Sequence, residues 1–337
     1  MLASFITALA GFELTDGEAS VLRSARPAGI ILFARNAHHP DQLRRLVEEA
    51  VTAIGAEDVL VLVDQEGGRV QRLKPPHWRR LPSGAAYAAA YARDPAGACR
   101  AAALAARLTA MELRAVGINT NCAPVVDLPA PDGHEIIGDR AYGTDPHQVV
   151  ALARAVAEGH MAGGVLPVVK HVPGHGRATA DSHLELPVVA ATREELEASD
   201  FEPFRRLAHL PAAMTAHVVF SAIDPAHPAS TSPSVVKNII RRSIGFDGLL
   251  MSDDLGMKAL VGSIAERAQA VLRAGSDLAL LCSGDLAETE SVAGVMPPLN
   301  GASRQRFERA CAVFRQQQPF DIAEAEAGLA HILRADA

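Results

Sequence analysis

Short apolar runs alternate along the chain with longer amphipathic stretches. Their length and aliphatic content predict eight buried strands, at residues 4–10, 28–33, 59–63, 118–126, 164–169, 212–219, 248–251 and 277–281. Between them, Leu, Val and Ala recur with the spacing of helices packed on a sheet, over residues 41–54, 85–116, 146–162, 193–207, 234–244 and 264–274. Strand and helix therefore alternate through most of the chain.

This alternation favours parallel strands with helices outside them. Eight strands in about 280 residues predict a (β/α)8 TIM barrel, with a doubly wound open sheet as the alternative. No internal repeat and no linker rich in Pro, Gly and Ser marks a second domain. We therefore expect a single domain over residues 1–337, with the barrel at about 3–295 and extra C-terminal helices at about 300–335.

Composition and charge restrict the possible functions. With 49% hydrophobic and 21% charged residues, the chain has the composition of a globular protein. A net charge of −7 offers no basic surface to nucleic acid or to an anionic membrane. The four cysteines contain no C-x-x-C pair, which favours reduced thiols and a cytoplasmic location; they are Cys99, Cys122, Cys282 and Cys311.

The apolar N-terminus has two interpretations. Residues 1–11 carry no Lys or Arg and are too few to span a bilayer. We interpret residues 4–10 as the first strand. A short uncharged secretion signal ending near Ala10 is the alternative, and the missing positive segment disfavours it.

Polar side chains gather directly after the predicted strands. The stretch K-H-V-P-G-H-G-R-A-T-A-D-S-H follows the fifth strand and contains Lys170, His171, His175, Asp181 and His183. In a parallel barrel the C-terminal strand ends meet at one face, where active sites lie. Other strands are followed by further polar residues, namely Asp64, Glu66, Arg69 and Arg72, then Asp127, His217, and Asp253 with Asp254. For Asp127 a helix N-cap is an equally open interpretation.

The absence of three common motifs makes several reaction classes less favoured. The chain has no G-x-S-x-G, no G-x-x-x-x-G-K-[ST] and no strand-linked G-x-G-x-x-G, so esterase, kinase and dinucleotide-binding functions lose their main support. Glycoside cleavage needs a carboxylate at the anomeric carbon, a proton donor and groups that bind sugar hydroxyls. The carboxylate and the hydroxyl-binding groups could come from Asp253, Asp64, Arg72 and Lys170, but these four residues leave the proton donor unassigned.

Five motifs resemble glycoside hydrolase family 3, and more closely its single-domain bacterial β-N-acetylglucosaminidases of muropeptide recycling. They are V-D-Q-E-G-G-R-V-Q-R (63–72), N-C-A-P-V-V-D (121–127), I-G-D-R-A-Y (137–142), K-H-V-P-G-H-G…D-S-H-L-E-L-P (170–187) and G-F-D-G-L-L-M-S-D-D-L-G-M (245–257). The resemblance implies hydrolysis with retention, without cofactor or metal. The implied substrate is N-acetylglucosamine β-1,4-linked to anhydro-N-acetylmuramic acid, with or without peptide.

The resemblance also implies a role for each matching residue. Asp253 would be the nucleophile that forms a covalent glycosyl-enzyme. His183 would be the general acid and base, and Asp181 would orient its imidazole. Five residues match positions that bind the non-reducing N-acetylglucosamine in the family: Asp64, Arg72, Arg140, Lys170 and His171.

Other polar residues are given structural interpretations. Asp254 is expected to be structural, because neighbours in a strand face opposite sides. His217 fits a buried histidine with its hydrogen bonds satisfied, and His175 a residue that shapes its loop. Arg69 and Glu66 are expected to brace the loop after the third strand. For Arg140 the alternative is a purely structural salt bridge with Asp139 or Glu135.

Other functions remain open at this point. Within the family, the alternatives are a β-glucosidase or xylosidase and a chitooligosaccharide hydrolase. Outside it, a metal-dependent barrel hydrolase could use His171, His175, His183, His217 and Asp253, although the first strand carries no H-x-H. A sugar-binding protein without catalytic activity is the second alternative outside the family. We expect a small carbohydrate as ligand, no nucleic-acid or membrane partner, and a monomer or weak homo-oligomer.

Overall fold

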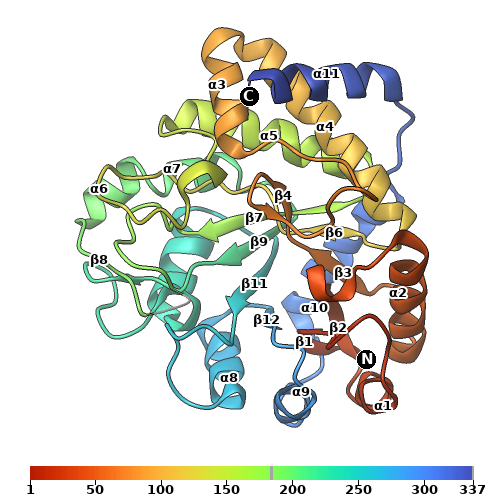
Figure 1. Ribbon diagram of the computed structural model, residues 1–337. Helices are drawn as coiled ribbons and strands as arrows, with labels where there is room; N and C mark the ends of the chain where they lie inside the picture. The colour runs from red at the N-terminus through yellow and green to blue at the C-terminus, as the bar shows by residue number, and fades with distance from the viewer. Residues whose placement is uncertain (183–184, 336–337) are drawn as a thin grey trace.

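The computed structural model describes residues 1–182 and 185–335 and contains a closed barrel of parallel strands surrounded by helices (Figure 1). β12 pairs with β1 through Phe5 and Ala279, which closes the barrel. The eight predicted strands and the TIM barrel are thereby confirmed, and the open sheet is excluded. In chain order the strands are β1 (Ala3–Ala8), β2 (Pro27–Leu32), β3 (Leu60–Val63), β6 (Thr120–Asn121), β7 (Leu166–Val172), β9 (Ala212–Thr215), β11 (Leu249–Asp254) and β12 (Leu278–Leu281).

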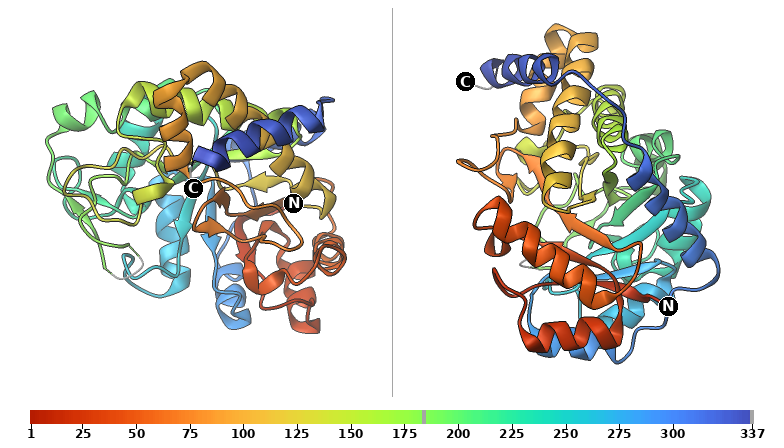
Figure 2. Two further views of the ribbon diagram at one scale, coloured as in Figure 1. Left: turned by 45° about the horizontal axis from the view of Figure 1, so that its top comes forward. Right: turned by 90° about the vertical axis from the view of Figure 1, so that its right-hand side faces the viewer.

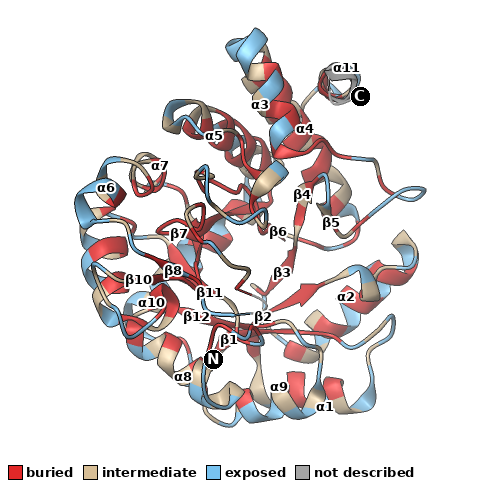
Figure 3. Ribbon diagram, turned by 60° about the vertical axis from the view of Figure 1, so that its left-hand side comes forward, coloured by how far each residue is buried: buried red, intermediate tan, exposed pale blue. Residues whose placement is uncertain are grey.

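Helices cover the outside of the barrel, and buried residues lie on the strands and on the helix faces turned toward them (Figure 3). None of the helices within residues 1–182 and 185–335 is long and apolar enough to cross a membrane. The helices of the barrel are α1 (Asp16–Ala25), α2 (Pro40–Ile54), α3 (Gly84–Arg93), α4 (Pro95–Ala115), α5 (Pro146–Ala162), α6 (Arg193–Ala198), α7 (Glu202–Arg206), the π-helix η4 (Val235–Ser243), α8 (Ile264–Ala274) and α9 (Leu286–Ala293).

Local sequence features explain three of the differences between the predicted elements and the structure. The helix predicted at 85–116 is divided at Asp94, whose side chain accepts the Gly97 N–H and caps α4. The unpredicted α1 begins with a capping box between Thr15 and Glu18. The fourth strand is shorter than predicted because Pro124 has no N–H for the ladder; its carbonyl still accepts the Lys170 N–H, so the chain follows β7 irregularly to Asp127.

The helices after the barrel lie at two places (Figure 2). α10 (Gly301–Cys311) packs Phe307 and Ala310 against aliphatic side chains of the barrel interior and covers its N-terminal end. α11 (Ile322–Ala335) lies against α4 and α3 on the outside. The C-terminal ends of the strands are left uncovered by either helix.

Asp277, just before β12, tests how much a buried carboxylate at the N-terminal end of the barrel stabilises the fold. Its buried carboxylate accepts hydrogen bonds from Arg241 (2.8 Å), from Ser303 (2.7 Å) and from the Leu250 N–H (2.9 Å). Asp277→Ala should lower the free energy of unfolding by about 3–5 kcal/mol, because the largely buried guanidinium of Arg241 loses its partner. Urea denaturation measures this loss in the free energy of unfolding. The matched variant Asp247→Ala removes a carboxylate that is 71% exposed and should cost at most about 1 kcal/mol; equal losses would contradict the prediction.

Candidate active site

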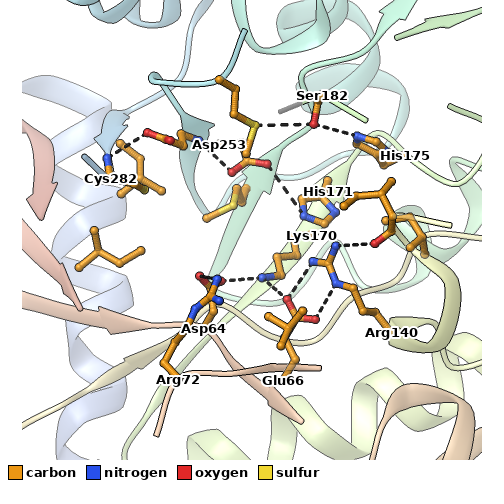
Figure 4. Close-up of a pocket in the computed structure, with 18 of the residues that line it drawn as sticks. Asp64, Glu66, Arg72, Arg140, Lys170, His171, His175, Ser182, Asp253 and Cys282 are labelled. Atoms are coloured by element: carbon orange, nitrogen blue, oxygen red, sulfur yellow. Dashed lines mark hydrogen bonds and ion pairs between the residues drawn. The ribbon is translucent and has the colours of Figure 1, made fainter. Parts of the chain in front are cut away.

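A cavity of about 180 Å³ lies at the C-terminal ends of the barrel strands (Figure 4). Its wall is formed by side chains from several strands and the loops after them. The polar lining residues are Asp64, Glu66, Arg69, Arg72, Arg140, Lys170, His171, His175, Ser182, Asp253 and Asp254, and among the apolar ones are Phe33, Met214, Met257 and Leu280. The structure therefore brings six of the predicted site residues together, from Asp64 to Asp253.

Five of the charged side chains form a row of alternating sign, which we call the ion row; its members are Arg72, Asp64, Lys170, Glu66 and Arg140. Lys170 Nζ lies 2.9 Å from Asp64 Oδ1 and 2.6 Å from Glu66 Oε1. Arg72 contacts the second oxygen of Asp64 at 3.1 Å. Arg140 binds both oxygens of Glu66, at 2.8 and 2.9 Å. Each charge in the ion row therefore has a neighbour of opposite sign.

The carboxylates of the ion row are ionised although they are largely removed from water. Burial raises the pKa of Asp64, but the charges of Lys170 and Arg72 outweigh it and hold that pKa well below its usual value. Glu66 is shifted the same way, since Lys170 and Arg140 outweigh burial and lower its pKa. For Lys170, burial lowers the pKa, and the two carboxylates raise it above its usual value. A fixed pattern of charge therefore faces the cavity.

Glu66 is a charged site residue that sequence reasoning missed. It was expected only to brace a loop, yet its side chain is 7% exposed and joins Arg140 to Lys170. The alternative that Arg140 forms a salt bridge with Asp139 or Glu135 is wrong, because its partner is Glu66. Asp139 instead binds Arg69 at 2.6 Å. Arg69 also donates to the carbonyls of residues 135, 136 and 137, so it ties its own loop after β3 to the loop after β6.

Asp253 lies at the end of β11 with its carboxylate at the cavity. Oδ1 accepts the Asp254 N–H at 2.8 Å, and Oδ2 lies 4.0 Å from His171 Nε2. Burial raises the pKa of Asp253, but the positive charges that His171 and His217 carry when protonated lower it below its usual value. An ionised carboxylate with an open face can act as a nucleophile or stabilise a developing cation.

Asp254 also lines the cavity, although it was expected to be structural. The pairing of β11 with β12 shifts its register between Met251 and Asp254. Its structural role is nonetheless visible, because Oδ1 accepts the N–H groups of Gly256 and Cys282. His217 is fully buried and hydrogen-bonded to Ser230 and to the Asp254 carbonyl, as expected.

Asp127 does not cap a helix. It is fully buried behind the cavity wall, and its Oδ2 lies 2.7 Å from His171 Nδ1. Oδ1 accepts the His175 N–H at 2.7 Å. His175 lines the cavity, which its interpretation as a loop-shaping residue did not include. Burial and the adjacent His171 lower the pKa of His175 to about 4, so its ring is neutral near pH 7.

The predicted acid and base, His183, lies outside the described residues. Asp181 is half-buried and is not among the residues that line the cavity. Ser182, between them in the chain, does line it: its Oγ lies 3.4 Å from His175 Nε2 and contacts the Met257 sulfur at 3.6 Å. Within residues 1–182 and 185–335, no three or more His, Cys, Asp or Glu side chains are placed to hold a metal ion.

The chain matches the family described as "Glycosyl hydrolase family 3 N terminal domain" over residues 6–312. It is 43% identical to a β-hexosaminidase of Alkalilimnicola ehrlichii over 84% of this chain and 81% of that protein. It is 40% identical to a β-hexosaminidase of Pseudomonas aeruginosa over 92% and 91% of the two chains. NagZ of Neisseria gonorrhoeae, solved in complex with N-trifluoroacetyl-D-glucosamine, superposes with a TM-score of 0.88 at 34% identity, over 98% of each chain. The protein is thus a glycoside hydrolase and belongs to glycosyl hydrolase family 3.

Proposed function

We propose that the protein is a retaining β-N-acetylglucosaminidase. It removes the terminal non-reducing, β-1,4-linked N-acetylglucosamine from muropeptides, in which the sugar is joined to anhydro-N-acetylmuramic acid with or without peptide. The observation that carries the proposal is the ionised Asp253 carboxylate at a cavity walled by the ion row. The β-hexosaminidases and the NagZ complex named above support the choice of N-acetylglucosamine.

The proposed reaction has two steps. Asp253 attacks the anomeric carbon and forms a glycosyl-enzyme ester, while the imidazole of His183, oriented by Asp181, protonates the leaving oxygen. The same imidazole then takes a proton from the water that breaks the ester, and two inversions give net retention. In both steps the sugar hydroxyls are held by the five binding residues, namely Asp64, Arg72, Arg140, Lys170 and His171.

The biological setting belongs to the same proposal. We place the enzyme in the bacterial cytoplasm, in peptidoglycan recycling, as one catalytic domain acting as a monomer or weak homo-oligomer. Four free cysteines support a reducing compartment, and the net charge of −7 offers no basic surface to nucleic acid or to an anionic membrane.

Removal of the nucleophile tests the reaction class. Asp253→Ala should lower kcat for a 4-nitrophenyl N-acetyl-β-glucosaminide by at least about 10⁴-fold, while Asp247→Ala, at the other end of the barrel, should retain normal turnover. A 2- or 5-fluoro sugar should label the peptide that contains Asp253, as mass spectrometry would detect. Undiminished turnover by Asp253→Ala, or a label on another peptide, would refute the assignment.

Glu66→Gln tests the ion row. The change keeps the side-chain volume but removes the charge shared by Lys170 and Arg140, so kcat/KM should fall by about 10- to 100-fold through misplaced binding groups. Steady-state kinetics with the same substrate measures the loss. The control Glu112→Gln alters a glutamate that binds Arg79 at 2.6 Å on the outer helix α4 and should leave kcat/KM unchanged. Equal kinetics of the two variants would contradict a role for Glu66.

The pH dependence of kcat/KM tests the proposed charge states of Asp253 and of the general acid. Asp253 must be ionised to attack, and its pKa lies below the usual 3.8, so kcat/KM should fall on the acid side only below that value. On the alkaline side the general acid loses its proton, which makes the profile bell-shaped. Initial rates from about pH 3 to 10 measure both limbs. A flat profile would count against this pair of groups.

A further inference from the structure

The ring of His171 stands between two carboxylates. Nδ1 lies 2.7 Å from Asp127 Oδ2, and Nε2 lies 4.0 Å from Asp253 Oδ2. The first distance is a short hydrogen bond, while the second is too long for one. The two nitrogens therefore have different tasks: one is bound to a buried carboxylate, and the other faces the cavity.

The donor in the short bond can be identified. Burial raises the pKa of Asp127. The positive charge that His171 carries when protonated, its hydrogen bond and the hydrogen bond from the His175 backbone N–H lower that pKa below its usual value. An ionised carboxylate can only accept hydrogen bonds. The shared proton is therefore on Nδ1 of His171, and a neutral ring then has its lone pair on Nε2.

We propose that Asp127 is a positioning residue that fixes His171 in the tautomer whose Nε2 accepts a hydrogen bond from a sugar hydroxyl. The inference rests on the proposed function, because it needs a sugar in the cavity. The opposite tautomer would present an N–H to the cavity. That nitrogen could no longer accept a hydrogen bond from a hydroxyl, and its N–H would point toward Asp253, whose Oδ2 lies 4.0 Å away.

The remaining contacts of Asp127 make the inference testable. Its oxygens also accept the backbone N–H groups of His171 (3.3 Å) and His175 (2.7 Å). In Asp127→Asn the amide oxygen can keep the backbone bonds, but an NH₂ group replaces the oxygen that accepts from Nδ1. This variant therefore changes the tautomer while most of the local hydrogen bonding is preserved.

The first measurement compares Asp127→Asn with a matched buried carboxylate. Asp127→Asn should lower kcat/KM by about 10- to 100-fold, the usual effect of losing such an orienting partner. Asp277→Asn, at the N-terminal end of the barrel, should lower the melting temperature but leave kcat/KM unchanged. Similar kinetic losses in both variants would show that any buried charge matters, and would overturn the inference.

A double-mutant cycle separates positioning from stability. If Asp127 acts through His171, Asp127→Asn should have almost no further effect, within about twofold, when His171 is already Ala. The effect of Asp127→Asn should likewise disappear with one of the 3-, 4- or 6-deoxy substrates. That substrate lacks the hydroxyl from which Nε2 accepts a hydrogen bond. Additive losses in the His171→Ala background, or equal losses with all three deoxy substrates, would overturn the inference.

A spectroscopic test does not depend on turnover. In ¹⁵N NMR spectra at about pH 8, where an ordinary imidazole is neutral, His171 should show a protonated Nδ1 and a bare Nε2. Asp127→Asn should move the proton to Nε2. A bare Nδ1, or a ring protonated at both nitrogens, in the unchanged protein would overturn the inference. Failure to cleave any N-acetyl-β-glucosaminide would instead reject the proposed function and leave the tautomer result standing.

Discussion

Lys170 is the constraint on which the cavity depends. Its ammonium group is almost completely buried, and an unpaired charge at such a position would be strongly unfavourable. Asp64 and Glu66 supply the opposite charges. Each of these two carboxylates is itself largely removed from water, with 15% and 7% of its side chain exposed, and each binds a second cation. Arg72 and Arg140 provide these. The ion row therefore follows from one buried ammonium group, and removing any member exposes its neighbours to the cost of desolvation.

The same requirement prepares the cavity for a sugar. Members of the ion row hold one another in place before any ligand arrives, so binding does not have to order them. Arg140 uses Nε and Nη2 for Glu66 and Nη1 for the Ile136 carbonyl, and its remaining N–H groups have fixed directions. Polar groups fixed in this way suit hydroxyl recognition, because each hydroxyl needs a donor or an acceptor at a defined point.

The sequence was informative where a local pattern decides the structure. Apolar runs mark the eight strands, and a residue directly after a strand, such as Asp64, must lie at the C-terminal face of a parallel barrel. Contacts between distant loops were not predictable in this way. Glu66 and Arg140 are 74 positions apart, and no spacing rule joins them. The shift of β11 against β12 likewise depends on pairing that a single strand does not reveal.

Crowding by carboxylates gives a reason for a histidine as the proposed acid. Asp64, Glu66, Asp253 and Asp254 all line one cavity, and burial together with the charge of Asp253 already raises the pKa of Asp254. A further carboxylic acid would become an anion after giving up its proton, and its charge would raise the pKa of the nucleophile. An imidazole that gives up its proton becomes neutral instead. The proposed acid can therefore be regenerated without adding negative charge beside Asp253.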